Sequence, residues 1–292
     1  MKKLMKRIIG ITLAMVCLFG ALPAIEAEAA TIVGGHTTQA TAYNWGTYSN
    51  GKSLTPIVLP EGENEFWVRF TVPSNERIYA RCSYSNEYAG MFTVMYNSTN
   101  QVVGLGADVI NPNSVIPFLA ANADNRTASS QTFFLQVRRG DFTGDMYFSL
   151  TLYDRIYTGN GTFSFSGTAS NPGNSSVSTA GVDSSILTLN LTNNTTIPPN
   201  AVVTYVSTAG TQSPSQGNVR HKIRPASSGW FTSTVTSATS GTFNVTLANN
   251  IFAAQQWEFQ YNALATAKST MKNVKLTLKW EYDIAFTNYA RF

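Results

Sequence analysis

The sequence predicts an all-β protein made of two antiparallel β-sandwich domains, of jelly-roll or Greek-key type, behind a cleaved signal peptide. Apolar and polar residues alternate with a period of two from Phe66 to the C-terminus, and clusters of Gly, Pro, Asn and Asp interrupt this alternation at strand-like spacing. No segment shows the 3.6-residue apolar stripe of an amphipathic helix. Charged residues make up 12% of the chain and aromatic residues another 12%, a balance that is typical of folded sheet proteins and not of disordered ones.

The first thirty residues have the parts of a bacterial secretion signal. A basic start is followed by the apolar run Ile8 to Leu22, and Ala27-Glu28-Ala29 offers the small residues that a signal peptidase needs. We expect cleavage after Ala29 or one residue later, and a secreted, extracellular product. The run is too short for a membrane anchor, which needs about 20 apolar residues. We therefore expect no transmembrane segment in the mature chain.

Removal of residues 1–30 changes the charge and the cysteine content. Four basic and two acidic residues leave with the signal, so that the net charge falls from +4 to +2. This small charge argues against nucleic acid as a partner. Cys82 is then the only cysteine; we expect it to be a buried thiol. No His, Cys or carboxylate set has zinc-like spacing, no cofactor is expected, and His221, between two cations, is predicted to lie on a solvated strand.

The first domain is predicted over residues 31–157. Phe66, Val68 and Phe70 would face the core of an antiparallel sandwich, and the segment Gly104 to Ser130 is expected to be a long loop. The expected strands are Glu65 to Val72, Arg77 to Tyr84, Met91 to Tyr96, Phe133 to Arg139 and Met146 to Asp154.

The second domain is predicted over residues 158–292, after a break at Gly159-Asn160-Gly161. It carries a net charge of +4, against −2 for residues 31–157. Its turns have the spacing of a second sandwich, and it resembles no family known to us. The expected strands are Thr162 to Ser166, Ser185 to Leu191, Ala201 to Ser207, Val219 to Arg224, Phe231 to Val235, Thr242 to Leu247, Gln256 to Asn262 and Lys272 to Asp283.

Three pieces of the N-terminal half resemble the bacterial pre-peptidase C-terminal type of secreted β-sandwich domain. They are the strand, turn and strand from Phe66 to Tyr79, the segment Met95 to Val103, and the closing hairpin from Thr132 to Leu152. The resemblance implies a sandwich domain of the kind appended to exported proteins. Some members have a calcium or collagen role, but the Asp-rich stretch that often precedes the third strand is replaced here by Glu87-Tyr88-Ala89-Gly90.

The period-two pattern also predicts an outward face that is rich in aromatic and directed polar side chains. Aromatic rings bury contact area at low entropic cost, and Arg supplies directed hydrogen bonds, so such a face suits a sugar or a protein ligand. The second domain or the long loop could instead cover it. The expected contact residues are Trp67, Arg69, Phe134, Arg138 and Tyr147.

The last predicted strand carries a basic strip of Lys272, Lys275 and Lys279 opposite its apolar positions. Two interpretations are open. The strip could attract anionic wall polymers or phospholipid, or it could protect an edge strand from pairing with another chain.

Acidic residues give the competing hypothesis, a secreted polysaccharide hydrolase. Such an enzyme needs two carboxylates across the scissile bond, which Glu61 to Glu65, Asp141 or Asp145 could provide. Asp141 and Asp145 are also weak calcium candidates; otherwise no metal site is expected.

These patterns favour a non-enzymatic binding or structural protein at the bacterial cell envelope or in the extracellular matrix. Its expected partner is a cell-wall polymer, an exopolysaccharide or an extracellular protein. An assembling structural protein or toxin subunit is a further alternative.

Overall fold

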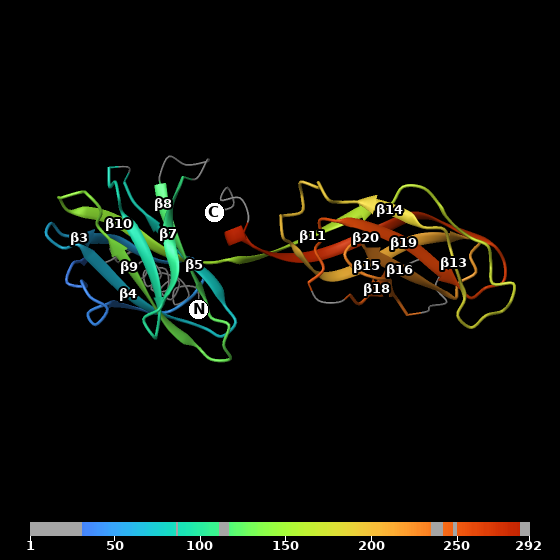
Figure 1. The fold of residues 1–292 in the computed structure, drawn as a ribbon, viewed down its shortest axis with the longest axis horizontal. Coiled ribbons are helices and arrows are strands. Elements are labelled where there is room, and N and C mark those ends of the chain that lie inside the picture. Colours follow the sequence, from blue (N-terminus) through green and yellow to red (C-terminus); the bar gives the residue numbers. More distant parts are fainter. Residues whose placement is uncertain (1–30, 86, 111–116, 235–241, 248–249, 287–292) are drawn as a thin grey trace, which may run out of the picture.

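The computed structural model describes residues 31–85, 87–110, 117–234, 242–247 and 250–286. The signal peptide predicted for residues 1–30 lies outside this set. The regular elements among the described residues are strands and one short 3₁₀ turn, η1 (Ile284–Phe286), joined by turns and loops. Figure 1 shows two sandwich-like domains placed end to end. The predicted all-β class with two sandwiches is confirmed.

The N-terminal domain contains two sheets that share one strand. Sheet A has the order β1-β3-β10-β5-β8-β7, and sheet B has the order β7-β6-β9-β4-β2. Two pairs near the sheet ends, β1 with β3 and β2 with β4, are parallel, so the sandwich is not purely antiparallel as predicted. The strands are β1 (Ile32–Val33), β2 (Tyr43–Thr47), β3 (Lys52–Leu59), β4 (Glu65–Val72), β5 (Arg77–Ser83), β6 (Phe92–Asn97), β7 (Val102–Ile110), β8 (Pro117–Asp124), β9 (Gln131–Arg138) and β10 (Met146–Asp154).

The predicted loop from Gly104 to Ser130 is wrong, because most of the described part of this segment is strand. The first half of β7 pairs with β6 in sheet B, and its second half pairs with β8 in sheet A. Gly104 permits this crossing, since a Cβ atom there would lie 2.4 Å from the backbone oxygen of Asn122 in β8. Small residues, glycine in β7 and alanine in β8, hide the alternation by which a strand is recognised.

The core of the N-terminal domain is closed by the inward residues of both sheets. Phe66, Val68 and Phe70 of β4 are almost fully buried there, as the alternation predicts. Cys82 of β5 belongs to the same cluster. Burial raises the pKa of its thiol, so the interpretation of Cys82 as a structural thiol is confirmed.

The C-terminal domain is a second pair of sheets. Sheet C has the order β11-β20-β15-β18, with β12 also paired to β20; sheet D has the order β13-β19-β16-β17, with β14 also paired to β19. The strands are β11 (Ile156–Ser164), β12 (Ala169–Asn171), β13 (Val182–Asp183), β14 (Leu187–Asn190), β15 (Val202–Ser213), β16 (Val219–Pro225), β17 (Phe231–Thr232), β18 (Thr242–Val245), β19 (Gln256–Ala263) and β20 (Ser269–Asp283).

The expected break at Gly159-Asn160-Gly161 does not occur, because these residues lie within β11 and pair continuously with β20. Gly159 is required by packing instead. A Cβ atom at this position would lie 2.5 Å from the Trp280 indole nitrogen. The glycine therefore makes room for a buried ring on the neighbouring strand and does not mark a turn.

His221 lies in the core of the C-terminal domain, which corrects its predicted place on a solvated strand. Its Nδ1 atom is 2.8 Å from the Thr208 hydroxyl of sheet C, and its ring stacks on Phe243 at 3.6 Å. The neighbouring cations Arg220 and Lys222 point to the opposite face, as successive strand residues must. Burial lowers the pKa of His221 to about 3.

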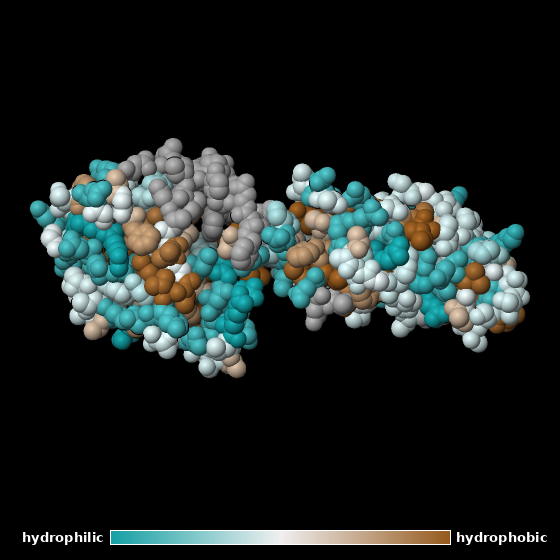
Figure 2. All heavy atoms as spheres, viewed as in Figure 1, coloured by the Kyte–Doolittle hydropathy of each residue, from teal (hydrophilic) through white to brown (hydrophobic). Residues whose placement is uncertain are grey.

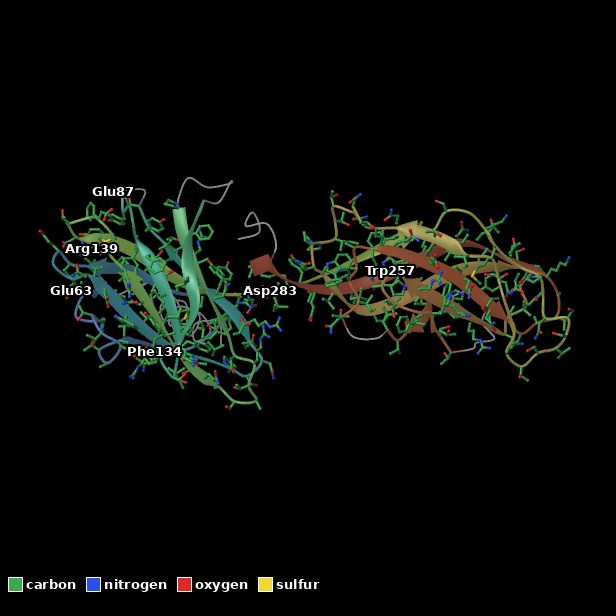
Figure 3. The ribbon with its side chains drawn as sticks, viewed as in Figure 1. Glu63, Glu87, Phe134, Arg139, Trp257 and Asp283 are labelled. Atoms are coloured by element: carbon green, nitrogen blue, oxygen red, sulfur yellow. The ribbon has the colours of Figure 1, made fainter. Side chains whose placement is uncertain are left out.

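The two domains are joined at a buried arginine between β10 and β11. The Arg155 amide donates to the Arg77 carbonyl, and the Arg155 carbonyl accepts from the Ile284 amide just after β20. The Arg155 guanidinium contacts the Asp124 carboxylate at 2.5 Å and the Asp283 carboxylate at 2.9 Å. Both crossings of the chain between the domains, of which Asp283 marks one in Figure 3, are therefore tied to one side chain.

Arg155 offers a test of this junction against a matched surface arginine. Its side chain is 6% exposed, whereas Arg126, which contacts the same Asp124, is 70% exposed. Arg155→Met should lower the free energy of unfolding by about 3 kcal/mol, because it leaves the nearly buried Asp283 carboxylate without its partner and removes the stronger of the two contacts to Asp124. Arg126→Met should cost less than about 1 kcal/mol. Urea unfolding measures both; equal losses would contradict the assignment.

His221 predicts a loss of stability in mild acid. The folded domain keeps His221 neutral, while the unfolded chain binds a proton below about pH 6.5. The free energy of unfolding is thus not reduced by His221 protonation above pH 6.5, and it declines as the pH falls toward 3, by up to about 1.4 kcal/mol per pH unit. Urea unfolding between about pH 6.5 and 4.5 should show this slope. The His221→Gln variant should be less stable at neutral pH but have a flatter profile, and an unchanged slope would contradict the prediction.

Candidate functional site

The outer face of sheet B holds four of the five contact residues predicted from the sequence. The register aligns Arg69, Phe134, Tyr96 and Val102 in one cross-strand row. Arg69 is exposed and Phe134, at the lower end of the domain in Figure 3, is half-buried. Arg138 is also exposed, next to Glu65 of β4.

Trp67 is packed within this face. Its side chain is 8% exposed, its ring stacks on Tyr96 at 5.3 Å, and its indole N–H donates to the Glu65 carboxylate at 2.9 Å. Tyr96 in turn donates to Gln136 at 3.0 Å. Trp67 therefore fixes its neighbours, whereas Tyr96, which the sequence-based selection omitted, is one of the rings that form this face.

Exposed aliphatic side chains lie beside the aromatic row on β7. Val102 is 54% exposed, Val103 43% and Leu105 61%. Figure 2 shows apolar atoms gathered on the N-terminal domain over the region of β7. An exposed apolar patch with charged neighbours is typical of a protein contact surface.

Tyr147 does not belong to this face, which corrects its grouping with Trp67. It lies on β10 opposite Val58 of β3, in sheet A, and is 57% exposed. Alternation assigns a residue to the outside of its own sheet but does not say which of two sheets the strand joins. The two outer faces of a sandwich point in opposite directions.

The acidic candidates are used to fix loops. The Glu63 carboxylate accepts from the Gly35 amide at 2.9 Å, and the Asp145 carboxylate accepts from the Glu61 amide at 2.8 Å. Of these three glutamates only Glu65 lies on a strand, so Glu61, Glu63 and Glu65 do not share one strand face. Asp141 is exposed on the hairpin loop.

Arg139 occupies the centre of these loops. It is buried, and it donates to the backbone carbonyls of Glu63 at 2.7 Å, Gly144 at 2.5 Å and Leu59 at 3.0 Å. Figure 3 shows it beside Glu63 at one end of the domain. Within the described ranges, Asp141 and Asp145 join no group of three side chains able to hold a metal.

The basic strip lies on a central strand. Lys272, Lys275 and Lys279 are all exposed on β20, which pairs with β11 on one side and β15 on the other. The interpretation of these lysines as edge protection is therefore wrong.

The outer face of sheet D contains an interlocked polar network that the sequence did not predict. The Asp183 carboxylate accepts from the Lys222 ammonium at 2.6 Å, the Gln260 amide at 2.9 Å and the Asn262 amide at 2.7 Å. Arg220 donates to the Asn262 side-chain oxygen at 3.0 Å. Burial raises the pKa of Asp183, but hydrogen bonds from Lys222 and Asn262 outweigh it and hold the pKa below its ordinary value. Asp183 is therefore charged at neutral pH.

This network lines an open hollow of about 590 Å³. The contacts among the described residues use one of the three Lys222 N–H groups and two of the five Arg220 donors. Several directed donors thus stay available to a ligand. The lining residues are Thr179, Ala180, Gly181, Asp183, Arg220, Lys222, Thr232 and Asn262.

Trp230 stands beside the network on the same face. The Lys222 ammonium lies 5.6 Å and the Arg224 guanidinium 4.9 Å from its ring centroid. Arg224 also pairs with the Glu258 carboxylate, and both residues line a second hollow of about 280 Å³. We name the outer face formed by Asp183, Arg220, Lys222, Trp230 and Asn262 the sheet D site.

The fold and these surfaces define a two-domain β-sandwich protein with a polar site on one outer face. No family model matches the chain. It is 42% identical over 260 residues to the uncharacterized protein YbdN of Bacillus subtilis strain 168, a match that covers 89% of this chain and 90% of YbdN. The chain belongs to the same family as YbdN.

Solved structures show more distant likenesses. The pre-peptidase C-terminal domain of a collagenase from Bacillus anthracis is 21% identical, with a TM-score of 0.29, over 38% of this chain and 93% of that domain. A candidate secreted protein from Eubacterium rectale is 10% identical, with a TM-score of 0.35, over 75% of this chain and 70% of its own. The first belongs to the family that the N-terminal half resembles in sequence, so the predicted weak resemblance is confirmed. In the described residues, no helix is long and apolar enough to cross a bilayer.

Asp183→Asn should change the charge of the sheet D site with little effect on folding. The Asp183 side chain is 40% exposed in its pair with Lys222, and pairs as open as this contribute less than about 1 kcal/mol. Thermal unfolding should therefore show nearly the wild-type midpoint. A large loss of stability would show that the network is mainly structural.

Proposed function

We propose that this chain is a secreted, non-enzymatic binding protein of the cell envelope or extracellular matrix that holds a polysaccharide on the sheet D site. The observation that carries the proposal is the Asp183 network, with its fixed charges and unused donors around an open hollow. Sugar hydroxyl groups both donate and accept hydrogen bonds. A surface that offers a carboxylate, an ammonium and amides in fixed positions matches them.

The strength of such contacts depends on how little the site must reorganise. Hydrogen bonds to ionised groups are stronger than neutral ones, and side chains that are already locked lose less entropy when the ligand binds. Lys222 and Asn262 are held by Asp183 before any ligand arrives. Trp230 adds an aromatic surface at the rim, where a sugar ring can pack its apolar face.

The outer face of sheet B supports a second binding role, for an extracellular protein. Exposed Val102 and Leu105 beside Arg69 and Phe134 give an apolar patch with a charged neighbour. An exposed apolar patch of this kind is typical of a protein contact surface, so we assign a protein and not a polysaccharide to this face.

The proposed absence of catalysis is supported by what the acidic residues do. Glu63, Glu65 and Asp145 each accept a hydrogen bond that fixes a loop or a ring. A hydrolase of polysaccharide would need two such groups placed across a sugar bond. Turnover of a glycan that disappears in one carboxylate-to-amide variant would favour the enzyme instead.

The polysaccharide proposal is tested with mature protein on immobilised peptidoglycan, chitin, cellulose and bacterial exopolysaccharide. Wild-type protein should be retained on at least one of them. Asp183→Asn and Trp230→Ala should each weaken retention by about tenfold, the effect expected when one charged hydrogen bond or one aromatic contact is lost.

Phe134→Ala serves as the matched aromatic control on the other domain, because its ring is half-buried like that of Trp230, and it should bind like wild type. No retention on any glycan would overturn the proposal, and so would equal retention by wild type and both sheet D variants. Loss of retention in Phe134→Ala alone would place the binding surface on sheet B instead.

A further inference from the structure

The lysines of β20 form a line of charge on the outer face of sheet C, on the opposite side of the C-terminal sandwich from the sheet D site. Lys275 and Lys279 are four residues apart on one strand and face the same way, which places them about 13 Å apart. Lys272 continues the line toward the start of the strand. Because β20 is paired on both sides, the strand itself has no free edge.

The cations on the two outer faces of this domain differ in whether they form ion pairs. On sheet D, Lys222 pairs with Asp183 and Arg224 with Glu258. On sheet C, the described residues give no ion pair to Lys272, Lys275 or Lys279. Among the described residues, sheet C therefore carries three lysines without an ion pair, whereas Arg220 is the one such cation in the sheet D site.

The neighbours of the lysines are uncharged. The register places Asn160 and Tyr205 beside Lys279, and Ser164 and Ala209 beside Lys275. Between these rows, the hydroxyls of Thr162 and Thr277 are 2.9 Å apart. These groups can donate and accept hydrogen bonds but cannot neutralise the ammonium charges.

The acidic residues at the end of β20 do not reach the line. Asp283 is engaged by Arg155 at the domain junction. Glu281 is two residues beyond Lys279 and lies in the next row, opposite Thr158 and Val202. The lysine line thus ends beside a carboxylate on the same face, but among the described residues no ion pair joins that carboxylate to a lysine of the line.

We propose that this lysine line binds a linear polyanion, with phosphodiester or phosphate groups along its chain. Three ammonium groups in a row match the repeated charge of an extended polymer. A lipid surface fits less well, because stable attraction to anionic membranes takes clusters of about four to eight basic residues. The rows beside the lysines also offer hydroxyl and amide groups to the polymer. The ring of Tyr205 is already in contact with Lys279, whose ammonium lies 5.2 Å from the ring centroid.

The test uses full-length mature protein and two probes, long-chain polyphosphate and poly(glycerol phosphate), with binding measured by calorimetry. Affinity should fall by about twentyfold between about 50 and about 200 mM NaCl, because three charge contacts release counterions. The double variant Lys275→Gln/Lys279→Gln should bind about tenfold more weakly at low salt and lose most of the salt dependence.

Lys52→Gln/Arg126→Gln is the matched control, since it removes the same charge from the N-terminal domain and should bind like wild type. Equal weakening in both double variants would overturn the proposal by showing a non-specific charge effect. So would the absence of salt-dependent binding to either polymer, or binding to phosphatidylglycerol vesicles without binding to the polymers. Asp183→Asn should bind the polymers normally, which separates this inference from the proposed polysaccharide site.

Discussion

The guanidinium of Arg155 is buried between two carboxylates from distant parts of the chain, Asp124 of β8 and Asp283 at the end of β20. A charge removed from water in this way is stable only when it is paired and hydrogen-bonded. The pairing therefore brings the end of the C-terminal domain back to its beginning. Since β11 leaves from this point and β20 returns to it, the position of sheet C depends on the same contact.

The C-terminal sandwich shows how one strand arrangement creates two different surfaces. Its interior holds Trp257, Phe259 and Tyr261 of sheet D against the inward residues of sheet C. Two polar bridges cross this interior, from His221 to Thr208 and from Tyr261 to Ser269. Such bridges satisfy polar groups that would be costly to bury alone.

The outer faces of the two sheets differ because alternation requires apolar residues only at the inward positions of each strand. On sheet D, Arg220 and Lys222 of β16 meet Asn262 and Asp183 from neighbouring strands, and the groups lock together. On sheet C, the lysines of β20 meet hydroxyls and amides. A locked network favours a ligand with many directed hydrogen bonds, whereas an uncompensated line of charge favours a polymer of opposite charge.

Most strands could be predicted from local pattern alone. The inward positions of β4 and the bounds of β10 follow from alternation, which records burial on one face. Segments without clear alternation cannot be predicted in this way, and β7 and β8, which are rich in glycine and alanine, are such segments. The glycines of β11 resemble a break between strands, although their role is to accommodate the Trp280 ring. His221 was misplaced because its charged neighbours, which point outward, suggested water on both faces.

The all-β class, the strands with clear alternation and the side of each such strand that faces the core follow from the amino-acid order alone. Which strands share a sheet became clear from the folded chain. That choice separated Tyr147 from Trp67, placed the lysines on a central strand, and brought Asp183 to Lys222 across 39 positions. The physical reason is that alternation is a property of one strand, whereas a binding surface is made by the register between strands that are distant in the chain.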